Sequence, residues 1–301
     1  MKRFAFKKID AFATGHSSGN PAGCIYLQHK NDITSEEMLR IVQQLQGFVS
    51  EVAYLAPSAQ QHVDFELTYY SAEREVDFCG HATIAIMYDV IKHDPILRQK
   101  TTITILTARK GQLAVENRLK TDDAVYITAP EPVFSPIAIP GSKIAAALRV
   151  PESALTGKYP LACVNAGLQT LLVPIRSLEE ILHITPDFQE LKTFCEQQDV
   201  DILTLFSDEV SHPQRQYRTR VFAPRFGYLE DPATGSGNAA FGYYLLQNGF
   251  WDGTPLILEQ NKLKDRANIV RLSTNTDNQG IQRVLFGGGA VVRIEGEYIL
   301  S

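Results

Sequence analysis

The chain has 301 residues, of which 44% are hydrophobic and 21% charged. These are globular values, and the length suits two ordinary domains that each bury a core. The net charge of -5 comes without a basic block, so we expect no nucleic-acid partner. No apolar run approaches the ~18 residues that span a bilayer, and no apolar stretch follows the basic N-terminal residues, so we expect neither a membrane anchor nor a signal peptide.

In the first half, strands are expected near residues 4–12 and 22–27. Thr34 and Glu37 have the spacing of a capping box, and apolar residues follow it at helical spacing through Leu45. Further strands are expected at 49–56 and 63–69. A nearly uninterrupted apolar helix is expected at 82–92, followed by short strands near 101–107, 111–117 and 123–129.

The second half repeats this order. Val164–Gly167 leads into a strand at 169–174, as Gly19–Gly23 leads into the strand at 22–27. Thr185-Pro186-Asp187 is expected to cap a helix that ends near 198, with the proline at its first position. Strands near 201–206 and 216–222, an apolar helix at 239–247, and strands near 255–260, 268–273, 282–286 and 289–300 complete the chain.

This order indicates a duplicated unit rather than a short repeat. A helix that is apolar all round must be buried on every side, so each half predicts a sheet curled around a central helix, in the α+β class. Four prolines between 130 and 141 mark the domain change. We expect an N-terminal domain at 1–130, completed by the last strand at 288–301, and a C-terminal domain at 131–287.

Two glycine-rich breaks, Asp77–Ala82 and Asp231–Ala240, each lead into one of the apolar helices. Glycine allows a ligand to approach the backbone closely. The first turn of the following helix presents unpaired N–H groups and the positive end of the helix dipole. Two such helix starts facing one cleft would bind an anionic substrate.

Four polar side chains are candidates for chemistry, and each has an ordinary structural alternative. Glu51, in an apolar strand, is either a solvent-facing residue or a general acid/base. His81 is either a capping and packing residue or a neutral imidazole that hydrogen-bonds the substrate. Asp231 either braces the second glycine loop or orients His81 or a substrate amine, and Ser236 is either a helix N-cap or a substrate donor.

Several other activities are not expected. The cysteines, at 24, 79, 163 and 195, include no CxxC pair, and the histidines form no ligand cluster, so no metal is expected and a reduced cytoplasmic protein is the simplest interpretation. Cys24 and Cys163 are expected in the core. Gly235–Ala240 matches a dinucleotide fingerprint with Glu259 downstream, but no strand directly precedes it. A nucleophile elbow and a Walker A sequence are both missing.

The motifs together resemble the phenazine-biosynthesis PhzF-like isomerase family. The resemblance covers the chain end to end and rests on Asp10–Phe12, Gly19–Gly23, Ser50-Glu51, Glu75–Thr83 and Glu230–Ser236. It implies a diaminopimelate epimerase-like fold of two pseudo-symmetric domains, each a curved, mostly antiparallel sheet or barrel around a central helix. It also implies a cofactor-free homodimer that moves a proton on a small carboxylate-bearing substrate, as the family's isomerase of dihydro-hydroxyanthranilate does.

The resemblance also implies roles for individual residues. Glu51, His81 and Asp231 would be catalytic, and the expected substrate contacts are Ser236, the backbone near Gly80 and Gly235, and Asn20, Ala82 and Gly237. The chain departs from the family at Thr68–Ala72, where an Arg-x-Phe-Thr-Pro-like run is usual, although Arg220–Pro224 keeps such a run in the second half.

Two other functions stay open. One is an epimerase or racemase that uses Cys79 with a partner other than a thiol, since Thr234 stands at the matching place in the second half. The other is a binding protein that keeps the fold without catalysis. The function that we expect is an isomerase in which Glu51 carries the proton.

Overall fold

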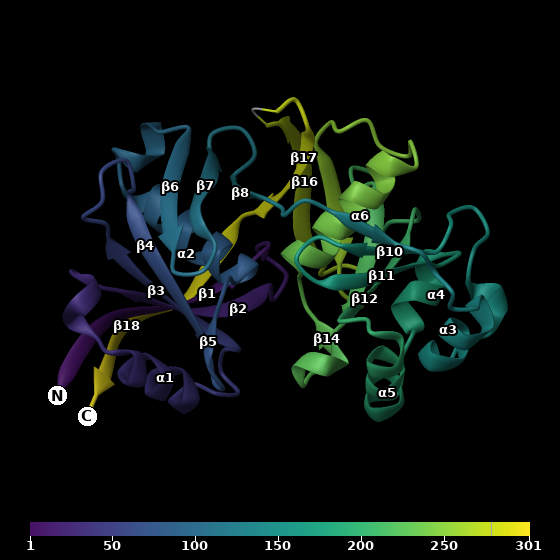
Figure 1. The fold of residues 1–301 in the computed structure, drawn as a ribbon, viewed down its shortest axis with the longest axis horizontal. Helices are drawn as coiled ribbons and strands as arrows, with labels where there is room; N and C mark the ends of the chain where they lie inside the picture. Colours follow the sequence, from purple (N-terminus) through teal and green to yellow (C-terminus); the bar gives the residue numbers. More distant parts are fainter. Residues whose placement is uncertain (278) are drawn as a thin grey trace. The chain divides into compact units, whose positions relative to one another are not determined.

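The computed structural model describes residues 1–277 and 279–301, which form two compact units. The first unit comprises Met1–Thr128 and Gly287–Ser301, and the second comprises Ala129–Phe286 (Figure 1). These bounds lie close to the expected divisions at 130 and 287, and the last strand belongs to the first unit. No described helix has both the length and the apolar character needed to cross a membrane.

The first unit has one sheet, which follows the order β18, β1, β2, β3, β4, β6, β7, β8, with β5 hooked onto β4. Most neighbours are antiparallel, and β2–β3 and β4–β6 are parallel. Its elements are β1 (Lys2–Ala11), β2 (Asn20–Tyr26), α1 (Ser35–Gln44), β3 (Glu51–Pro57), β4 (Phe65–Ser71), β5 (Glu75–Val76), α2 (Gly80–His93), β6 (Thr102–Thr107), β7 (Gly111–Arg118), β8 (Ala124–Thr128) and β18 (Ala290–Leu300).

Helix α2 is the centre of this unit. It packs against β1, β2, β3, β8 and β18, and therefore touches strands from both ends of the sheet order (Figure 1). Residues Ala82–Asp89 of the helix are all buried. A sheet whose first and last strands contact one helix must curl around it, as the all-round apolar sequence predicts.

Helix α1 packs against the sheet in a separate hydrophobic cluster. Met38, Ile41 and Val42 meet Phe4, Ile25 and other sheet residues there. Thr34 is the N-cap and accepts from the backbone N–H of Glu37, whose side chain accepts from the backbone N–H of Thr34. The predicted capping box is therefore confirmed.

The second unit repeats the strand order as β9, β10, β11, β12, β13, β15, β16, with β14 on β13. The two parallel pairs, β11–β12 and β13–β15, occur at the matching places. Its elements are β9 (Val133–Ser135), α3 (Gly141–Leu148), β10 (Ala162–Asn165), β11 (Gln169–Pro174), α4 (Leu178–His183), α5 (Phe188–Gln198), β12 (Ile202–Ser207), β13 (Tyr217–Phe222), β14 (Glu230–Asp231), α6 (Gly235–Gln247), β15 (Leu256–Gln260), β16 (Asn268–Thr276) and β17 (Gln282–Gly288), which crosses the unit boundary.

Helix α6 takes the place of α2 and packs against β10, β11, β12 and β16. Helices α3, α4 and α5 contribute to a hydrophobic cluster with Leu171, Leu203 and Phe222. The expected duplication is thus present in the strand pairing of the two units.

Three helix starts differ from the sequence expectation. Helix α5 has Asp187 as its N-cap, which accepts from the backbone N–H groups of Gln189 and Glu190. Pro186 therefore precedes the cap instead of opening the helix. The central helices begin earlier than predicted, at Gly80 and Gly235, because the glycine breaks themselves form their first turns.

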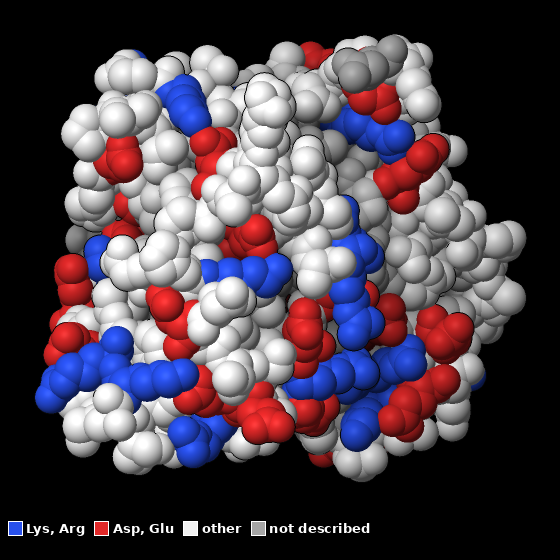
Figure 2. Space-filling view, turned by 60° about the vertical axis from the view of Figure 1, so that its left-hand side comes forward, with Lys and Arg blue, Asp and Glu red and all other residues white. Residues whose placement is uncertain are grey.

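The four cysteines are buried thiols outside any disulfide, and Cys24 and Cys163 lie in the core as expected. Figure 2 shows acidic and basic side chains interspersed on the visible face. Several surface charges form ion pairs, for example Lys2 with Glu37 at 2.7 Å and Arg3 with Glu297 at 2.8 Å.

Candidate functional site

Glu51 is the first residue of β3, opposite Ala22 of β2 and Ser71 of β4. Its side chain is 21% exposed, but its Oε2 atom is shielded from solvent and has no hydrogen-bond partner. Glu51 is therefore only partly solvent-facing, with one carboxylate oxygen turned into the protein. A shielded carboxylate oxygen without a hydrogen bond needs an explanation, because buried polar atoms are nearly always satisfied.

His81 lies in the first turn of α2, next to Glu51. Its Nε2 atom is 3.4 Å from Glu51 Oε2, which is ion-pair distance without hydrogen-bond geometry. Its Nδ1 atom is 3.4 Å from Sγ of Cys79, the N-cap residue of the helix. One ligand atom from each of these three residues lies within 4.8 Å of the others. The structure thus groups Cys79 with two of the predicted catalytic residues.

The start of α2 lacks a side-chain cap from its N-cap residue. Cys79 makes no side-chain hydrogen bond to the first-turn amides. Of the predicted substrate contacts, Gly80 is partly buried, Ala82 is 0% exposed and Asn20 is 3% exposed. Ala82 and Asn20 are therefore closed to solvent in this structure, and a substrate contact at either residue stays a prediction.

A buried hydroxyl pair supports this helix start from below. Thr83 Oγ1 donates to the carbonyl of Cys79 at 2.7 Å, so the Tyr69 hydroxyl, 2.6 Å away, donates to Thr83. Burial raises the pKa of Tyr69 far above its usual range, which keeps the phenol protonated as a donor. Sequence reasoning missed both residues.

The second helix start has a different polar frame. Thr234 is the N-cap of α6, so the alternative in which Ser236 caps this helix is wrong, and Ser236 lies inside the first turn. The Asp231 carboxylate accepts a hydrogen bond from the Thr234 hydroxyl. Asp231 therefore braces the glycine loop, in line with its structural alternative, and this contact does not test a role toward substrate.

Asn238 and Gln260 complete the frame of the second helix start. Gln260 Oε1 accepts from the Thr234 backbone N–H at 2.9 Å and from Asn238 Nδ2 at 2.6 Å. Asn238 Nδ2 also donates to the Thr234 carbonyl at 2.7 Å, as Thr83 does to the Cys79 carbonyl in the first unit. Thr83 and Asn238 stand at the same place in the two repeats, and this shared position was the signal that could have found them.

Strand register gives the remaining matches between the two halves. Tyr69 of β4 pairs with Val76 of β5, and Val221 of β13 pairs with Asp231 of β14. These two pairs occupy the same place in the repeats, so Val76 corresponds to Asp231. Three residues further along the chain, Cys79 corresponds to Thr234. His81 then corresponds to Ser236. On β3 and β4, Glu51 lies opposite Ser71. The counterpart of Ser71 is Ala223, and the residue before it, Phe222, lies opposite Leu203. Because the strands are antiparallel, the residue before Leu203, Ile202, is the counterpart of Glu51. The second unit thus has no carboxylate, thiol or imidazole at the places of Glu51, Cys79 and His81.

The comparisons with known proteins agree with this fold and these motifs. The family model for phenazine biosynthesis-like proteins matches residues 9–296. The chain belongs to this family. An uncharacterized isomerase of Bacillus subtilis, YfhB, is 29% identical over 278 residues, covering 91% of this chain and 92% of the relative.

Solved structures support the fold. A phenazine biosynthesis protein of the PhzF family from Bacillus anthracis matches over the full length of both chains, with a TM-score of 0.86 and 23% identity. A hydroxyproline epimerase from Agrobacterium vitis matches over 99% of this chain and 91% of its own, with a TM-score of 0.58 and 12% identity. The expected α+β, epimerase-like fold of two related domains is confirmed.

The departure from the family's Arg-x-Phe-Thr-Pro-like run has a local explanation. Arg220, in the second unit, is 2% exposed and forms two bonds of 2.8 Å with Glu230. It also donates to the carbonyls of Ile181 and Ile184 at the end of α4. Thr68 stands at the matching place of β4, and at the place of α4 the first unit has a shorter segment, the 3-10 helix Lys30–Asp32.

Gly235 and Gly237, the glycines of the dinucleotide-like match, allow close packing in the second unit. An added Cβ at Gly235 would lie 2.4 Å from the Phe286 ring, and one at Gly237 would lie 2.9 Å from Thr204 Oγ1. Both glycines lie within α6 rather than in a strand-to-helix loop. These contacts account for both glycines without a ligand.

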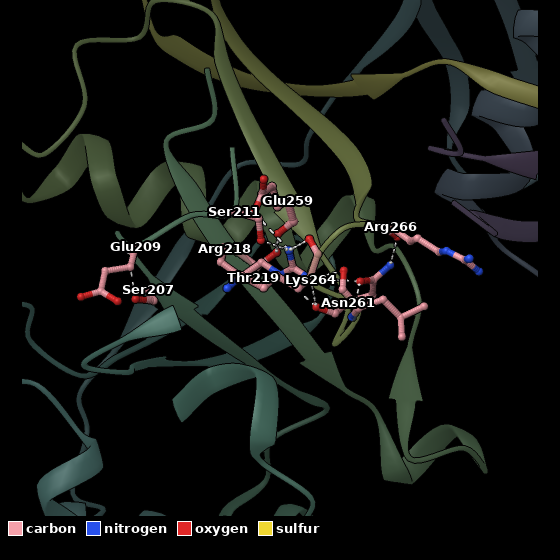
Figure 3. A network of polar contacts seen from close by, with 10 residues as sticks. Ser207, Glu209, Ser211, Arg218, Thr219, Glu259, Asn261, Lys264 and Arg266 are labelled. Atoms are coloured by element: carbon pink, nitrogen blue, oxygen red, sulfur yellow. Dashed lines mark hydrogen bonds and ion pairs between the residues drawn. The ribbon is translucent and has the colours of Figure 1, made fainter. Parts of the chain in front are cut away.

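Glu259, the acidic residue of the same match, forms a buried ion pair. Glu259 is 2% exposed and pairs with Arg218 at 3.1 Å (Figure 3). Arg218 further donates to the carbonyls of Asn261 at 2.7 Å and Leu263 at 2.9 Å. Glu259 therefore stabilises the loop that follows β15 and is not available to a ribose.

Proposed function

We propose that this protein is an isomerase that moves a proton within a small carboxylate-bearing substrate, with Glu51 as the general acid/base. The observation that carries the proposal is the shielded, unbonded Oε2 of Glu51, 3.4 Å from His81 at an uncapped helix start. The isomerase class is supported by the family and by the names of relatives such as YfhB.

The first unit supplies the parts that such a reaction needs. A carboxylate oxygen without a hydrogen bond can accept a substrate proton without first giving up a protein partner. The first-turn amides of α2 would hold the substrate carboxylate, because a helix start favours negative charge. His81 Nε2 would polarise the substrate beside the reacting carbon. Together these residues would keep the proton donor and the substrate aligned.

The residue matches between the repeats favour one acid/base over two. A two-base racemase needs a second proton-transfer group, and Ile202, Thr234 and Ser236 occupy the matching places. Neither an alkyl group nor a simple hydroxyl is a good proton carrier near neutral pH. We therefore propose that Glu51 removes the proton and returns it. The roles of Asp231 and Ser236 in substrate binding stay predictions, testable with Asp231→Asn and Ser236→Ala.

The test is proton exchange in heavy water. The protein is incubated in D2O with cyclic amino acids and related carboxylates, including dihydro-hydroxyanthranilate and trans-4-hydroxyproline, and mass spectrometry follows deuterium uptake. We expect Glu51→Gln to lower the exchange rate at least about 10²-fold. Glu73→Gln is the control, because Glu73 is an exposed residue of the same unit. Full exchange in Glu51→Gln would refute the assignment.

An epimerase that uses Cys79 is the second candidate, because Cys79 Sγ lies 3.4 Å from His81 Nδ1. An imidazole beside a thiol promotes the thiolate, which is the form that accepts protons. The two candidates differ in one comparison. Loss of exchange in Cys79→Ala with exchange kept in Glu51→Gln would favour the epimerase, and the opposite pattern would favour the isomerase.

A further inference from the structure

The cluster of Glu51, Cys79 and His81 has a composition that the sequence analysis did not recognise. It brings together a carboxylate oxygen, a thiol sulfur and an imidazole nitrogen from β3, the α2 N-cap and the first turn of α2. The three ligand atoms lie within 4.8 Å of one another, and among the described residues this is the group of acidic, Cys and His side chains that meets this criterion. The residues are too far apart in sequence to form a spacing motif.

The donor atoms suit a small cation that accepts sulfur. His81 Nε2 is 3.9 Å from Cys79 Sγ and 3.4 Å from Glu51 Oε2. Zinc binds sulfur at about 2.3 Å and nitrogen or oxygen at about 2.0–2.2 Å, so the edges of its tetrahedron are roughly 3.3–3.6 Å long. His81 Nε2 and Glu51 Oε2 already have this spacing. Cys79 Sγ lies nearer to the other ring nitrogen, Nδ1, at 3.4 Å, so the Cys79 side chain or the imidazole must turn to complete the site. Magnesium and calcium prefer oxygen ligands and would not use the thiol.

The electrostatics of the cluster point the same way. Glu51 Oε2 is shielded from solvent and makes no hydrogen bond, so a bound cation would satisfy an atom that the protein leaves unpaired. We propose that this cluster binds one Zn²⁺ ion per chain, with Glu51, Cys79 and His81 as its protein ligands and the fourth position open. The matching residues in the second unit, Ile202, Thr234 and Ser236, offer no such donor set, which is why the stoichiometry is one.

Zinc binding would compete with the proposed reaction. The lone pair of Glu51 that accepts the substrate proton is the one that would bind the ion. Bound Zn²⁺ would therefore inhibit isomerisation. This inhibitory effect rests on the proposed function, whereas the binding itself does not.

Cobalt provides a direct optical test, because Co²⁺ replaces Zn²⁺ and its bond to a thiolate gives a near-ultraviolet charge-transfer band. Metal-free protein is titrated with CoCl2, then with ZnCl2. We expect the band to saturate at one Co²⁺ per chain and to disappear as Zn²⁺ displaces it. Cys79→Ser should abolish the band, and Glu51→Gln and His81→Gln should each weaken Co²⁺ binding at least about tenfold. Cys163→Ser, which changes a buried thiol of the other unit, is the matched control and should keep the band.

A second measurement needs no variant. Iodoacetamide labelling of the wild-type protein, read by peptide mass spectrometry, should be slowed at Cys79 by ZnCl2 and restored by EDTA, with no change at Cys163. A missing one-to-one band, a band that survives Cys79→Ser, or labelling of Cys79 that ZnCl2 leaves unchanged would overturn the proposed site.

The heavy-water exchange assay separates this proposal from the proposed function. Binding together with inhibition supports both. Binding with unchanged exchange overturns the inhibitory role, and exchange that rises with added Zn²⁺ overturns the proposed metal-independent role of Glu51 while the zinc site stands.

Discussion

Replacing Glu259 with glutamine should strongly destabilise the second unit. The Arg218 guanidinium is fully buried and Glu259 is its one acidic partner among the described residues, at 3.1 Å. Burial lowers the pKa of Arg218, and the hydrogen bond and charge of Glu259 oppose that shift. Glu259→Gln keeps the size of the side chain but removes the negative charge, so a buried guanidinium is left without a counter-charge.

The expected cost follows from burial. Removing one partner of a buried ion pair costs about 3–5 kcal/mol. Arg218 would keep its bonds to the carbonyls of Asn261 and Leu263, so we expect the lower end, about 3 kcal/mol. With a urea m-value of about 2 kcal/mol/M, the unfolding midpoint would fall by about 1.5 M.

The assay uses the single tryptophan of the chain. Trp251 lies in the second unit, is 9% exposed and donates to the Thr254 carbonyl, so its fluorescence reports the unfolding of that unit. Far-ultraviolet circular dichroism follows both units, which guards against treating a stepwise transition as two-state.

Glu297→Gln is the matched control. Glu297 makes the same kind of contact with Arg3, at 2.8 Å, but the two side chains are 57% and 55% exposed. Exposed pairs contribute about 0–1 kcal/mol, so this variant should barely change either transition. The reasoning fails if Glu259→Gln costs less than about 1 kcal/mol, or if the two variants shift their midpoints equally.

Three further predictions test other parts of the structure. Gly235→Ala should destabilise the second unit by about 1–3 kcal/mol, because its Cβ would lie 2.4 Å from Phe286, whereas Gly157→Ala, with open space around its Cβ, should have little effect on the Trp251 transition. Thr83→Val should cost about 1–3 kcal/mol, because it leaves the buried Tyr69 hydroxyl without its acceptor and removes one of the hydrogen bonds to the Cys79 carbonyl, and Tyr69→Phe should cost less, as measured by thermal melts; equal costs would contradict the assigned donor chain. Burial raises the pKa of the Cys195 thiol from 9.0 to about 12, so between these values the unfolded chain releases a proton that the folded protein keeps. The stability that the protonated thiol contributes is therefore complete below pH 9 and is lost as the pH rises toward 12. Cys195→Ala should therefore show a smaller fall in urea midpoint between about pH 8 and about pH 10.5 than the wild type, and identical slopes would contradict the shift.

The sequence by itself determined the repeated strands and the two central helices, although it did not predict α3 or α4. The capping box at Thr34 and Glu37, the alternating strands and the two all-round apolar helices depend on neighbouring residues, and local spacing carries that information. The same local information placed Glu51 in a strand and His81 at a helix start. It also allowed errors of one or two residues at caps, as at Asp187 and Thr234, because several polar residues in a row can each cap a helix.

Tertiary structure decided what those side chains face. Curling of the first sheet around α2 brings Glu51 to within 3.4 Å of His81, and the N-cap geometry turns Cys79 toward the same imidazole. Strand register also showed that Ile202 stands at the place of Glu51 in the second repeat, although the two halves share their topology. Such contacts join residues far apart in the chain. Local sequence patterns do not specify which distant strands pair, and it is this pairing that creates the contacts.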